Sequence, residues 1–548
     1  MLMSSVSRRL CAAAACLACA AAAFAQAELS LIPRPDSVQS REGRLTLRPG
    51  CAAALPAGCP ESYGRALSEA AGFGVARADA PAAAAIRFLP ADRLPSGAAP
   101  KGEGYALLVT PDALSVYAST PAGHFYGLQT AAQLLRAAPR ENGSVALPGV
   151  EIRDAPRFGW RGYMLDEARH FSGREAVMRL LDAMAYYKLN RLHWHLTDSS
   201  GWRLEIKAYP KLTEVGSRGS ETDRRPDAPA QFYTQAEIRE IVAYARERQI
   251  AIVPEVEMPG HADAAVLSYP ELDGGGYVQK GRTDKWPRFT FNPAKPETLV
   301  FLDTVLKETA ALFPGAGVIH FGGDEVHFGC QKWPSLPEVQ SLMKKEGFTT
   351  IEEVETWFNR RMAASVNGLG FKTGGWDEVA ARDLPRDKTV VFWWRHDKPQ
   401  VLRGVLDAGY PVVLCPRRPC YFDFLQLESH TTGRRWSGIN PLGDVYAFPE
   451  GLGLQPSDEA KVLGLQACLW AETTVSQARR DFLTWPRLVA LAEAAWTPQA
   501  RKDFASFQSR LPAHLQQLRA RGIGYYDPFA NSPEVTDGQT GKPKAHLD

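Results

Sequence analysis

The stretch Arg191-Leu-His-Trp-His-Leu196 is a short strand-like run, and seven similar apolar runs occur along the chain. Helical patterns separate most of them, as in residues 174–187, where apolar side chains follow helical spacing. Strands that alternate with helices predict a parallel sheet, and eight repeats predict an α/β fold of the closed (β/α)8 TIM-barrel type. A doubly wound open sheet is the alternative, but no Gly-rich dinucleotide-binding loop supports it. The other seven runs are residues 161–166, 251–256, 317–325, 371–376, 389–394, 411–416 and 463–470.

The barrel pattern accounts for only part of the chain. A single hydrophobic core stops growing near ~250–300 residues, so 548 residues predict at least two domains. Residues 26–156 carry short strand patterns and a helix pattern that begins at Thr120-Pro121, an N-cap followed by proline. We expect a small α+β accessory domain at 26–156, the barrel at 157–504, and a C-terminal helix with a polar tail at 505–548.

The first 25 residues have the pattern of a secretory signal peptide. Arg8 and Arg9 precede an apolar run over residues 10–24 that ends in an Ala-Phe-Ala cleavage site. We expect residues 1–25 to be removed and the protein to be exported, to the periplasm or the medium. Cys16 and Cys19 would suit a lipoprotein signal, but neither has Leu or Val three positions earlier.

Composition excludes several classes of protein. The chain has 63 Lys+Arg and 61 Asp+Glu, so 63 − 61 leaves a net charge of +2. A nucleic-acid binder normally shows a basic excess, so this balance argues against one, and against electrostatic membrane binding. No run after the signal approaches the ~18 apolar residues of a membrane-spanning helix.

Six cysteines follow the expected cleavage site. An exported protein meets an oxidising compartment, so disulfides can form. Cys51 with Cys59 and Cys415 with Cys420 are close enough in sequence to pair. Buried thiols are the alternative, and both readings stay open. The remaining two are Cys330 and Cys468.

Side chains that can do chemistry gather where the predicted strands end. The carboxyl ends of the strands of a barrel meet at one rim, where the active sites of this fold lie. Flat aromatic rings flank sugar faces, carboxylates and arginines bind hydroxyl groups, and paired carboxylates cleave glycosidic bonds. The rim is therefore expected to act on carbohydrate. Its residues are Asp166, Arg169, His170, Asp198, Glu255, Glu257, His261, Asp324, Glu325, Trp376, Trp394, Arg395, Tyr421, Asp423, Trp470 and Glu472.

Two of these features have other readings. His193 and His195 share a strand face and could bind a metal, but later strands supply tryptophan instead of further ligands, which favours a site without metal. Asp166 could cap the next helix. Asp324 and Glu325 are adjacent, and adjacent strand residues point to opposite sides, so they need not form an ordinary acid and nucleophile pair.

At this level of detail the chain resembles glycoside hydrolase family 20, the β-N-acetylhexosaminidases. The resemblance covers nearly all of the chain after the signal, including the accessory α+β domain, which the segment from Tyr105 to Leu135 resembles. It rests on four signatures in order: Arg161-Gly-Tyr-Met-Leu-Asp-Glu-Ala-Arg-His170, His193-Trp-His-Leu-Thr-Asp198, Pro254-Glu-Val-Glu-Met-Pro-Gly-His261 and Gly322-Gly-Asp-Glu325.

The resemblance implies a mechanism and a function. Retaining glycosidases normally use a carboxylate nucleophile, but in this family the 2-acetamido oxygen of the substrate attacks the anomeric carbon. Asp324 would orient that group and stabilise an oxazolinium ion, and Glu325 would act as acid and then as base. His261 and Asp198 would support Glu325. The implied function is exo-acting, retaining removal of terminal β-linked N-acetylglucosamine or N-acetylgalactosamine from glycans, with no cofactor or metal.

The resemblance also implies the sugar contacts. Tyr421 would hydrogen-bond the acetamido oxygen, and aromatic and charged side chains would surround the rest of the terminal sugar. The expected walls are Trp376, Trp394 and Trp470, the hydroxyl-binding residues are Arg169, Asp423 and Glu472, and a rim platform is Trp436.

Some positions depart from the family pattern. Ser199-Ser200 stands where a second Asp followed by Gln is frequent, Glu257 stands where Asp is common, and an insertion lies around Gly274. The resemblance gives none of these positions a role in catalysis. We therefore expect the departures to affect which glycans are accepted beyond the terminal sugar. A disaccharide-releasing or 6-sulfo-sugar-preferring enzyme is the alternative within the fold; a glycan-binding protein without activity and a metal-dependent hydrolase are alternatives outside it. The residues leave the natural glycan, the preferred epimer and the oligomeric state open.

Overall fold

The structure is a computed structural model that describes residues 29–277, 286–435, 438–530 and 533–535. The expected signal peptide and the end of the expected polar tail lie outside the described residues. Within them the chain forms two compact units, one of residues 29–155 with 505–514 and one of 156–504 with the residues from 515 onward. The C-terminal helix α17 (Phe504–Ala520) contributes residues to both units.

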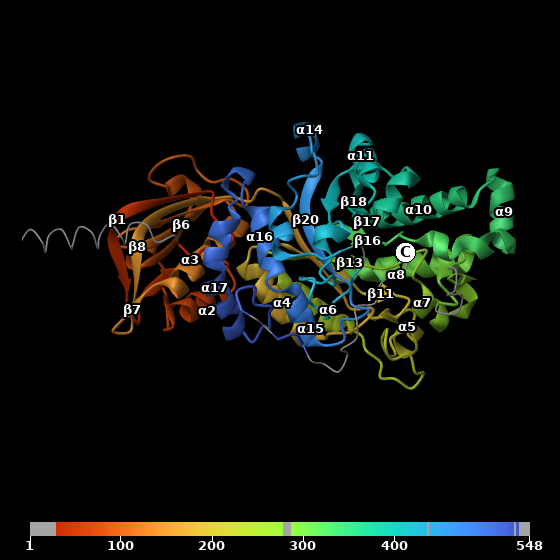
Figure 1. Ribbon diagram of the computed structural model, residues 1–548, viewed down its shortest axis with the longest axis horizontal. Coiled ribbons are helices and arrows are strands. Elements are labelled where there is room, and N and C mark those ends of the chain that lie inside the picture. The colour runs from red at the N-terminus through yellow and green to blue at the C-terminus, as the bar shows by residue number, and fades with distance from the viewer. Residues whose placement is uncertain (1–28, 278–285, 436–437, 531–532, 536–548) are drawn as a thin grey trace, which may run out of the picture. The chain divides into compact units, whose positions relative to one another are not determined.

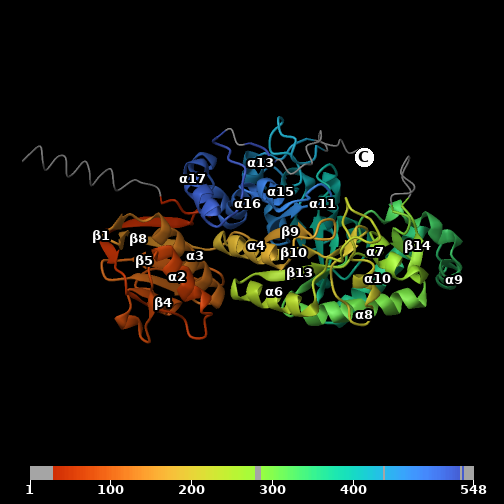
Figure 2. The ribbon, with the colours of Figure 1, turned by 90° about the horizontal axis from the view of Figure 1, so that it is seen from below.

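The first unit is a mixed sheet with two helices, α2 (Ser62–Ala71) and α3 (Pro121–Ala137). As the sequence predicts, Thr120 caps α3: its Oγ1 accepts a hydrogen bond from the Gly123 N–H at 3.0 Å. Helix α3 lies against the sheet, where a Cβ on Gly127 would meet Val116 at 2.3 Å; Figure 2 shows both helices beside the strands. The main strand order is β1 (Ser37–Leu47), β8 (Ser144–Asp154), β5 (Tyr105–Val109), β6 (Leu114–Ala118), β4 (Ile86–Pro90), β2 (Ala52–Ala54), β3 (Ala76–Arg77).

The second unit contains a closed barrel of eight parallel strands, which confirms the predicted fold class. The last strand, β20 (Val462–Leu469), pairs with the first, β9 (Trp160–Asp166), in parallel register from Gly464↔Trp160 to Leu469↔Leu165, and this pairing closes the barrel. Figure 1 shows the strands inside a layer of helices. The strands are β9 (Trp160–Asp166), β10 (Arg191–His195), β13 (Ala251–Glu255), β16 (Val318–His320), β17 (Lys372–Trp376), β18 (Thr389–Trp393), β19 (Val412–Leu414) and β20 (Val462–Leu469).

The outer helices begin at sequence signals that the chain supplies. Thr234 and Thr350 each form a capping box with the glutamate three residues later, at the starts of α6 (Gln235–Glu247) and α10 (Ile351–Gly368). Proline occupies the first turn of α8 and α11. The main outer helices are α4 (Arg174–Tyr186), α6 (Gln235–Glu247), α8 (Pro296–Leu312), α10 (Ile351–Gly368), α11 (Pro399–Asp407) and α16 (Arg487–Trp496).

The barrel strands are buried along nearly their whole length, because helices cover one face and the barrel interior covers the other. Small hairpins extend the carboxyl-terminal rim, β11 (Thr197–Asp198) with β12 (Gly201–Trp202) and β14 (Asp273–Gly275) with β15 (Thr290–Phe291). The predicted run 317–325 is a strand only over β16, because the chain turns sharply at the glycines that follow.

The six described cysteines are free thiols, and Cys415, Cys420 and Cys468 are buried. Of the two readings that the sequence leaves open, the structure therefore contains thiols and no local disulfide among these residues. Among the described helices, none is long and apolar enough to span a membrane.

Candidate active site

A pocket at the carboxyl-terminal rim of the barrel collects most of the predicted site residues. Its walls come from the ends of seven strands and from the loops that follow them. Its lining residues are Arg169, His261, Asp324, Glu325, Trp376, Trp394, Tyr421, Arg434, Trp470 and Glu472. Nine of these ten were predicted, and Arg434 was not. Asp198 and Asp423 are buried and contact pocket-lining side chains, and Trp436 lies outside the described residues.

The loop after β16 brings two adjacent carboxylates into the pocket together. Gly322, Gly323 and Glu325 have φ values of 71°, 85° and 54°, so the alternation of an extended strand no longer holds here. A Cβ on Gly322 would lie 1.6 Å from Oε2 of Glu257, so any other residue there would displace this buried carboxylate. The left-handed turn therefore explains how Asp324 and its neighbour both reach the same pocket.

His261 lies between the two carboxylates and a third one behind them. Its Nε2 is 3.4 Å from Oδ2 of Asp324 and 3.5 Å from Oε2 of Glu325. Its Nδ1 is 3.3 Å from Oδ1 of Asp198. Burial alone would lower the pKa of His261, but Asp198 and Asp324 raise it well above its usual range. The ring is therefore an imidazolium at neutral pH and stabilises negative charge on both sides.

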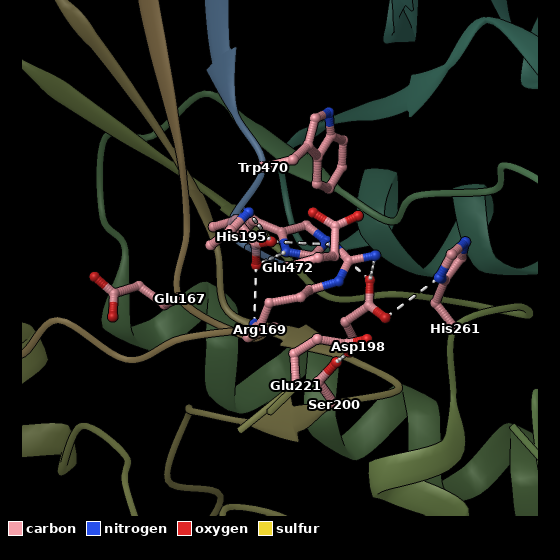
Figure 3. A network of polar contacts seen from close by, with 12 residues as sticks. Glu167, Arg169, His195, Asp198, Ser200, Glu221, His261, Trp470 and Glu472 are labelled. Carbon is pink, nitrogen blue, oxygen red and sulfur yellow. Dashed lines mark hydrogen bonds and ion pairs between the residues drawn. The ribbon is translucent and has the colours of Figure 1, made fainter. Parts of the chain in front are cut away.

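Asp198 connects this histidine to an arginine. Figure 3 shows Asp198 between Arg169 and His261, with contacts to both. Nη2 of Arg169 is 2.8 Å from Oδ2 of Asp198, and its Nη1 is 3.3 Å from Oδ2 of Asp166. Burial favours the neutral acid, but Arg169 and His261 lower the pKa of Asp198, so it stays ionised. The guanidinium lies over the Trp470 ring, 5.0 Å from its centroid.

The two histidines of β10 have partners that the sequence did not assign. His193 Nε2 lies 2.9 Å from Oε2 of Glu255, and His320 Nδ1 lies 2.7 Å from Oε1 of the same carboxylate. His195 lies 3.1 Å from Asp166. These groups have the composition of metal ligands, as do the residues around His261. Two of these atoms, His193 Nε2 and Glu255 Oε2, have no hydrogen-bond partner among the described residues. The expectation of a site without metal stays a prediction.

Aromatic rings form one end of the pocket. The ring of Trp470 lies 5.6 Å from Trp376 and 5.9 Å from Tyr421, centroid to centroid. Carboxylates bind two indoles: Trp376 Nε1 donates to the buried Glu255 at 2.9 Å, and Trp394 Nε1 donates to the partly buried Glu378 at 3.0 Å. These rings make a rigid apolar enclosure of the kind that a small acyl group fits.

Tyr421 keeps its proton in this enclosure. Burial raises the pKa of Tyr421 well above its usual range, so the hydroxyl is a donor. Its position is fixed by Asn440, whose Nδ2 donates to the Tyr421 carbonyl at 2.7 Å. A neutral donor next to apolar rings can bind a carbonyl oxygen.

Charged groups form another part of the pocket. Nη1 of Arg434 lies 3.0 Å from Oε1 of Glu472 and 3.7 Å from Oδ2 of Asp423. Burial raises the pKa of Asp423 to about 7, although Arg434 opposes the rise. Both oxygens of Asp423 and Oε2 of Glu472 are buried and have no hydrogen-bond partner among the described residues. Such acceptors suit the hydroxyl groups of a sugar.

Sequence reasoning missed Arg434 and Glu378 as parts of the site, and it placed Glu255 at the rim without its role. Glu255 ends a predicted strand, so its place at the rim was visible but its indole partner was not. Glu378 follows Trp376 by two residues, and burial together with Asp377 raises its pKa well above the usual range. Arg434 lies in a loop with no motif of its own, and nothing local to the sequence indicates that it turns back to Asp423.

Comparisons with known proteins agree with this geometry. Residues 158–499 match the model of glycosyl hydrolase family 20, catalytic domain, and residues 28–155 match its domain 2. This chain belongs to glycosyl hydrolase family 20. It is a glycoside hydrolase of the β-hexosaminidase type. The family assignment confirms the resemblance inferred from the four signatures.

Individual family 20 proteins are similar over most of the chain. The β-hexosaminidase of Vibrio furnissii is 35% identical over 485 residues, which are 85% of this chain and 76% of the relative. That of Porphyromonas gingivalis is 38% identical over 445 residues, and the chain spans 56% of its length. Among solved structures, the exo-β-N-acetylglucosaminidase of Vibrio harveyi, in complex with N-acetylglucosamine, has a TM-score of 0.81 at 30% identity, covering 92% of this chain and 79% of that one.

Proposed function

We propose that this hydrolase removes single terminal β-linked N-acetylhexosamine residues from glycans, with retention of configuration and through an oxazolinium intermediate. The observation that carries the proposal is the shared contact of Asp324 and Glu325 with one nitrogen of His261, at 3.4 and 3.5 Å. An acid and a protein nucleophile must reach the anomeric carbon from opposite faces of the sugar. Two carboxylates on the same side of one imidazole suit an acid and a group that positions the substrate.

The first step forms the intermediate inside the substrate. The acetamido group lies between the rings of Trp376, Trp394 and Trp470, and Tyr421 donates a hydrogen bond to its oxygen. That oxygen bonds to C1 while the glycosidic C–O bond breaks, and Glu325 gives its proton to the leaving oxygen. Asp324 accepts from the acetamido N–H, and its charge stabilises the oxazolinium cation.

The second step reverses the roles. Glu325, now ionised, takes a proton from a water molecule, and the water oxygen bonds to C1 as the ring C–O bond of the oxazolinium breaks. The acetamido group is restored, and the product is the β anomer. The imidazolium of His261 stabilises Glu325 in its ionised form between the steps.

The test combines activity with stereochemistry. We expect wild type to hydrolyse p-nitrophenyl β-N-acetylglucosaminide and to release the β anomer first, as observed by proton NMR. Glu325→Gln and Asp324→Asn are expected to lose about 10²–10⁴ in kcat. A thiazoline analogue of the intermediate should inhibit strongly. Full activity in both variants, or first release of the α anomer, would contradict the mechanism.

Exo action has its own readout. A closed set of hydroxyl-binding groups at the end of the pocket, Asp423, Glu472 and Arg169, suits the end of a chain. Digestion of chitotetraose should therefore yield N-acetylglucosamine and chitotriose as first products, and chitobiose as the first and only product would favour a disaccharide-releasing enzyme.

We also propose that the protein is exported. The support is Arg8 and Arg9 before the apolar run 10–24. Fractionation of the native host, with deletion of residues 2–25 as the control, tests this. Retention of the full-length precursor in the cytoplasm would contradict it.

A further inference from the structure

We propose that Arg434 contacts the terminal sugar directly and determines recognition of its C4 and C6 hydroxyl groups. The inference rests on the proposed function, because it assigns a role within the same sugar pocket. Arg434 is absent from the set of sugar contacts that the family resemblance implied. Its side chain nevertheless lines the pocket beside Glu472, and only 5% of it is exposed.

The backbone directs this side chain into the pocket. The N–H of Arg434 donates to the carbonyl of Asp423 at 2.7 Å, and the N–H of Leu425 donates to the carbonyl of Arg434 at 3.0 Å. The preceding residue, Gly433, has φ 129°, and a Cβ there would lie 3.0 Å from the Asp423 carbonyl. Two backbone hydrogen bonds and this close approach therefore fix residues 433–434 against the segment that carries Asp423. This limits the directions in which the Arg434 side chain can point.

The arginine sits next to acceptors that a sugar can use. Nη1 contacts Glu472 at 3.0 Å and approaches Asp423 to 3.7 Å, a separation too long for a hydrogen bond. Within the described residues, both oxygens of Asp423 and Oε2 of Glu472 lack hydrogen-bond partners although they are buried. A hydroxyl group both donates and accepts, so one placed here can donate to a carboxylate and accept from the guanidinium.

The orientation of the sugar decides which hydroxyl groups these are. C1 must face Glu325, and the 2-acetamido group must face Asp324 and Tyr421. In a six-membered ring the atoms farthest from C1 and C2 are C4 and C5, and C5 carries C6. The C4 and C6 hydroxyl groups therefore face the part of the pocket that contains Asp423, Arg434 and Glu472.

Arg434 also affects the charge of Asp423. Burial raises the pKa of Asp423 to about 7, and Arg434 is the first group that opposes this rise. Without the guanidinium the carboxyl would be more fully protonated, so a hydroxyl would lose both a donor and an ionised acceptor. Lysine would keep the charge but not the planar set of N–H donors.

The experiment compares Arg434→Gln, Arg434→Lys and wild type on three p-nitrophenyl β-N-acetylglucosaminides: the parent, the 4-deoxy and the 6-deoxy compound. For the parent we expect kcat/KM to fall about ten- to hundredfold in the glutamine variant, the range for loss of a hydrogen bond to a charged group. The loss should be smaller for at least one deoxy analogue, because the hydroxyl partner is already missing. The lysine variant should lie between the other two.

Arg435→Gln is the matched control, because Arg435 is the next residue and pairs with Glu428 at the surface. It should leave all three substrates unaffected. If the glutamine variant does not fold, as judged by its thermal transition, the lysine variant supplies the same comparison. Equal losses on all three substrates would overturn the role of Arg434, whereas a wild-type protein without activity on the parent would overturn the proposed function instead.

Discussion

Nε2 of His261 lies 3.5 Å from Oε2 of Glu325, and the same imidazole contacts Asp198 through its other nitrogen. This contact connects a strand-end carboxylate of one barrel segment to the loop that carries the acid of the proposed reaction. It also places a positive charge next to Glu325, whose own charge changes during the proposed reaction. The histidine is therefore expected to affect how the reaction rate depends on pH.

His261→Asn should lower kcat about ten- to hundredfold, a part of the 10²–10⁴ that general acid–base catalysis contributes. It removes a cation beside Asp324 and Glu325, so the acid limb of the pH–rate profile should move to higher pH. Steady-state kinetics from pH 4 to 9 provide the measurement. The control is His430→Asn, another buried histidine, which packs on Phe482 and Tyr526. A lower kcat with an unmoved profile would show a structural role only.

Gly322→Ala should cost more stability than Gly315→Ala. Both residues have positive φ, 71° and 83°, so both variants carry the cost of a left-handed alanine, about 1–2 kcal/mol. Only the Cβ at residue 322 meets a neighbour, Glu257 at 1.6 Å, and nothing lies within 4 Å of one at residue 315. Urea unfolding should show a difference of at least about 1–3 kcal/mol between the variants. Equal midpoints would contradict the close approach of Glu257.

Asp423→Asn should stabilise the folded protein while it lowers activity. The pKa of Asp423 is about 7 when folded, above the model-peptide value of ~3.9. Ionisation therefore disfavours folding, and the stability of wild type should fall as pH rises from about 4 to 7. The gain in the variant should grow over that window, to at most a few kcal/mol at ~1.4 kcal/mol per pKa unit. Differential scanning calorimetry at pH 4.5, 6 and 8 tests this, and a gain that is constant with pH would refute it.

His195 and His193, on the same strand, should show opposite pH effects on stability. Burial lowers the pKa of both, but Glu255 and Asp166 raise that of His195 well above its usual range, whereas the pKa of His193 falls to about 4. His195→Gln should cost about 3–5 kcal/mol at neutral pH, because it leaves buried carboxylates unpaired. That stabilising contribution is complete below pH ~6.5 and is lost as pH rises through the folded pKa.

For His193 the dependence of folding stability on pH has the opposite sign, and the variant His193→Gln tests this. A lowered folded pKa means that wild type loses stability as pH falls from about 6.5 to about 4, while it is unaffected above that range. Unfolding curves of both variants between pH 4 and 10 separate the cases. If the free energy of unfolding changed with pH in the same way in both variants, this would contradict the conclusion that, of these two histidines, only His195 is charged.

The sequence by itself determined the barrel and most of the chemistry. Eight short apolar runs with helical patterns between them suffice for a closed parallel barrel, because each strand is buried on both faces and each helix needs only one apolar face. The rule that strand ends share a rim then brought Asp198, His261, Asp324, Trp470 and Glu472 into one site. Local signals also located helix starts, such as Thr120-Pro121.

Only the tertiary structure decided where side chains point and which residues far apart in the sequence come into contact. The left-handed turn at Gly322 and Gly323 placed two adjacent carboxylates on one pocket, against strand alternation. Residue 322 is glycine because Glu257, in the loop after β13, occupies the space that a Cβ would need. The anchors of Trp376 and Trp394 come from Glu255 and Glu378, and the contact of Arg434 with Glu472 joins two loops 38 positions apart. Such pairs produce no repeating pattern in the sequence from which they could be predicted, because a hydrogen bond or ion pair depends on distance in space and not on spacing in sequence.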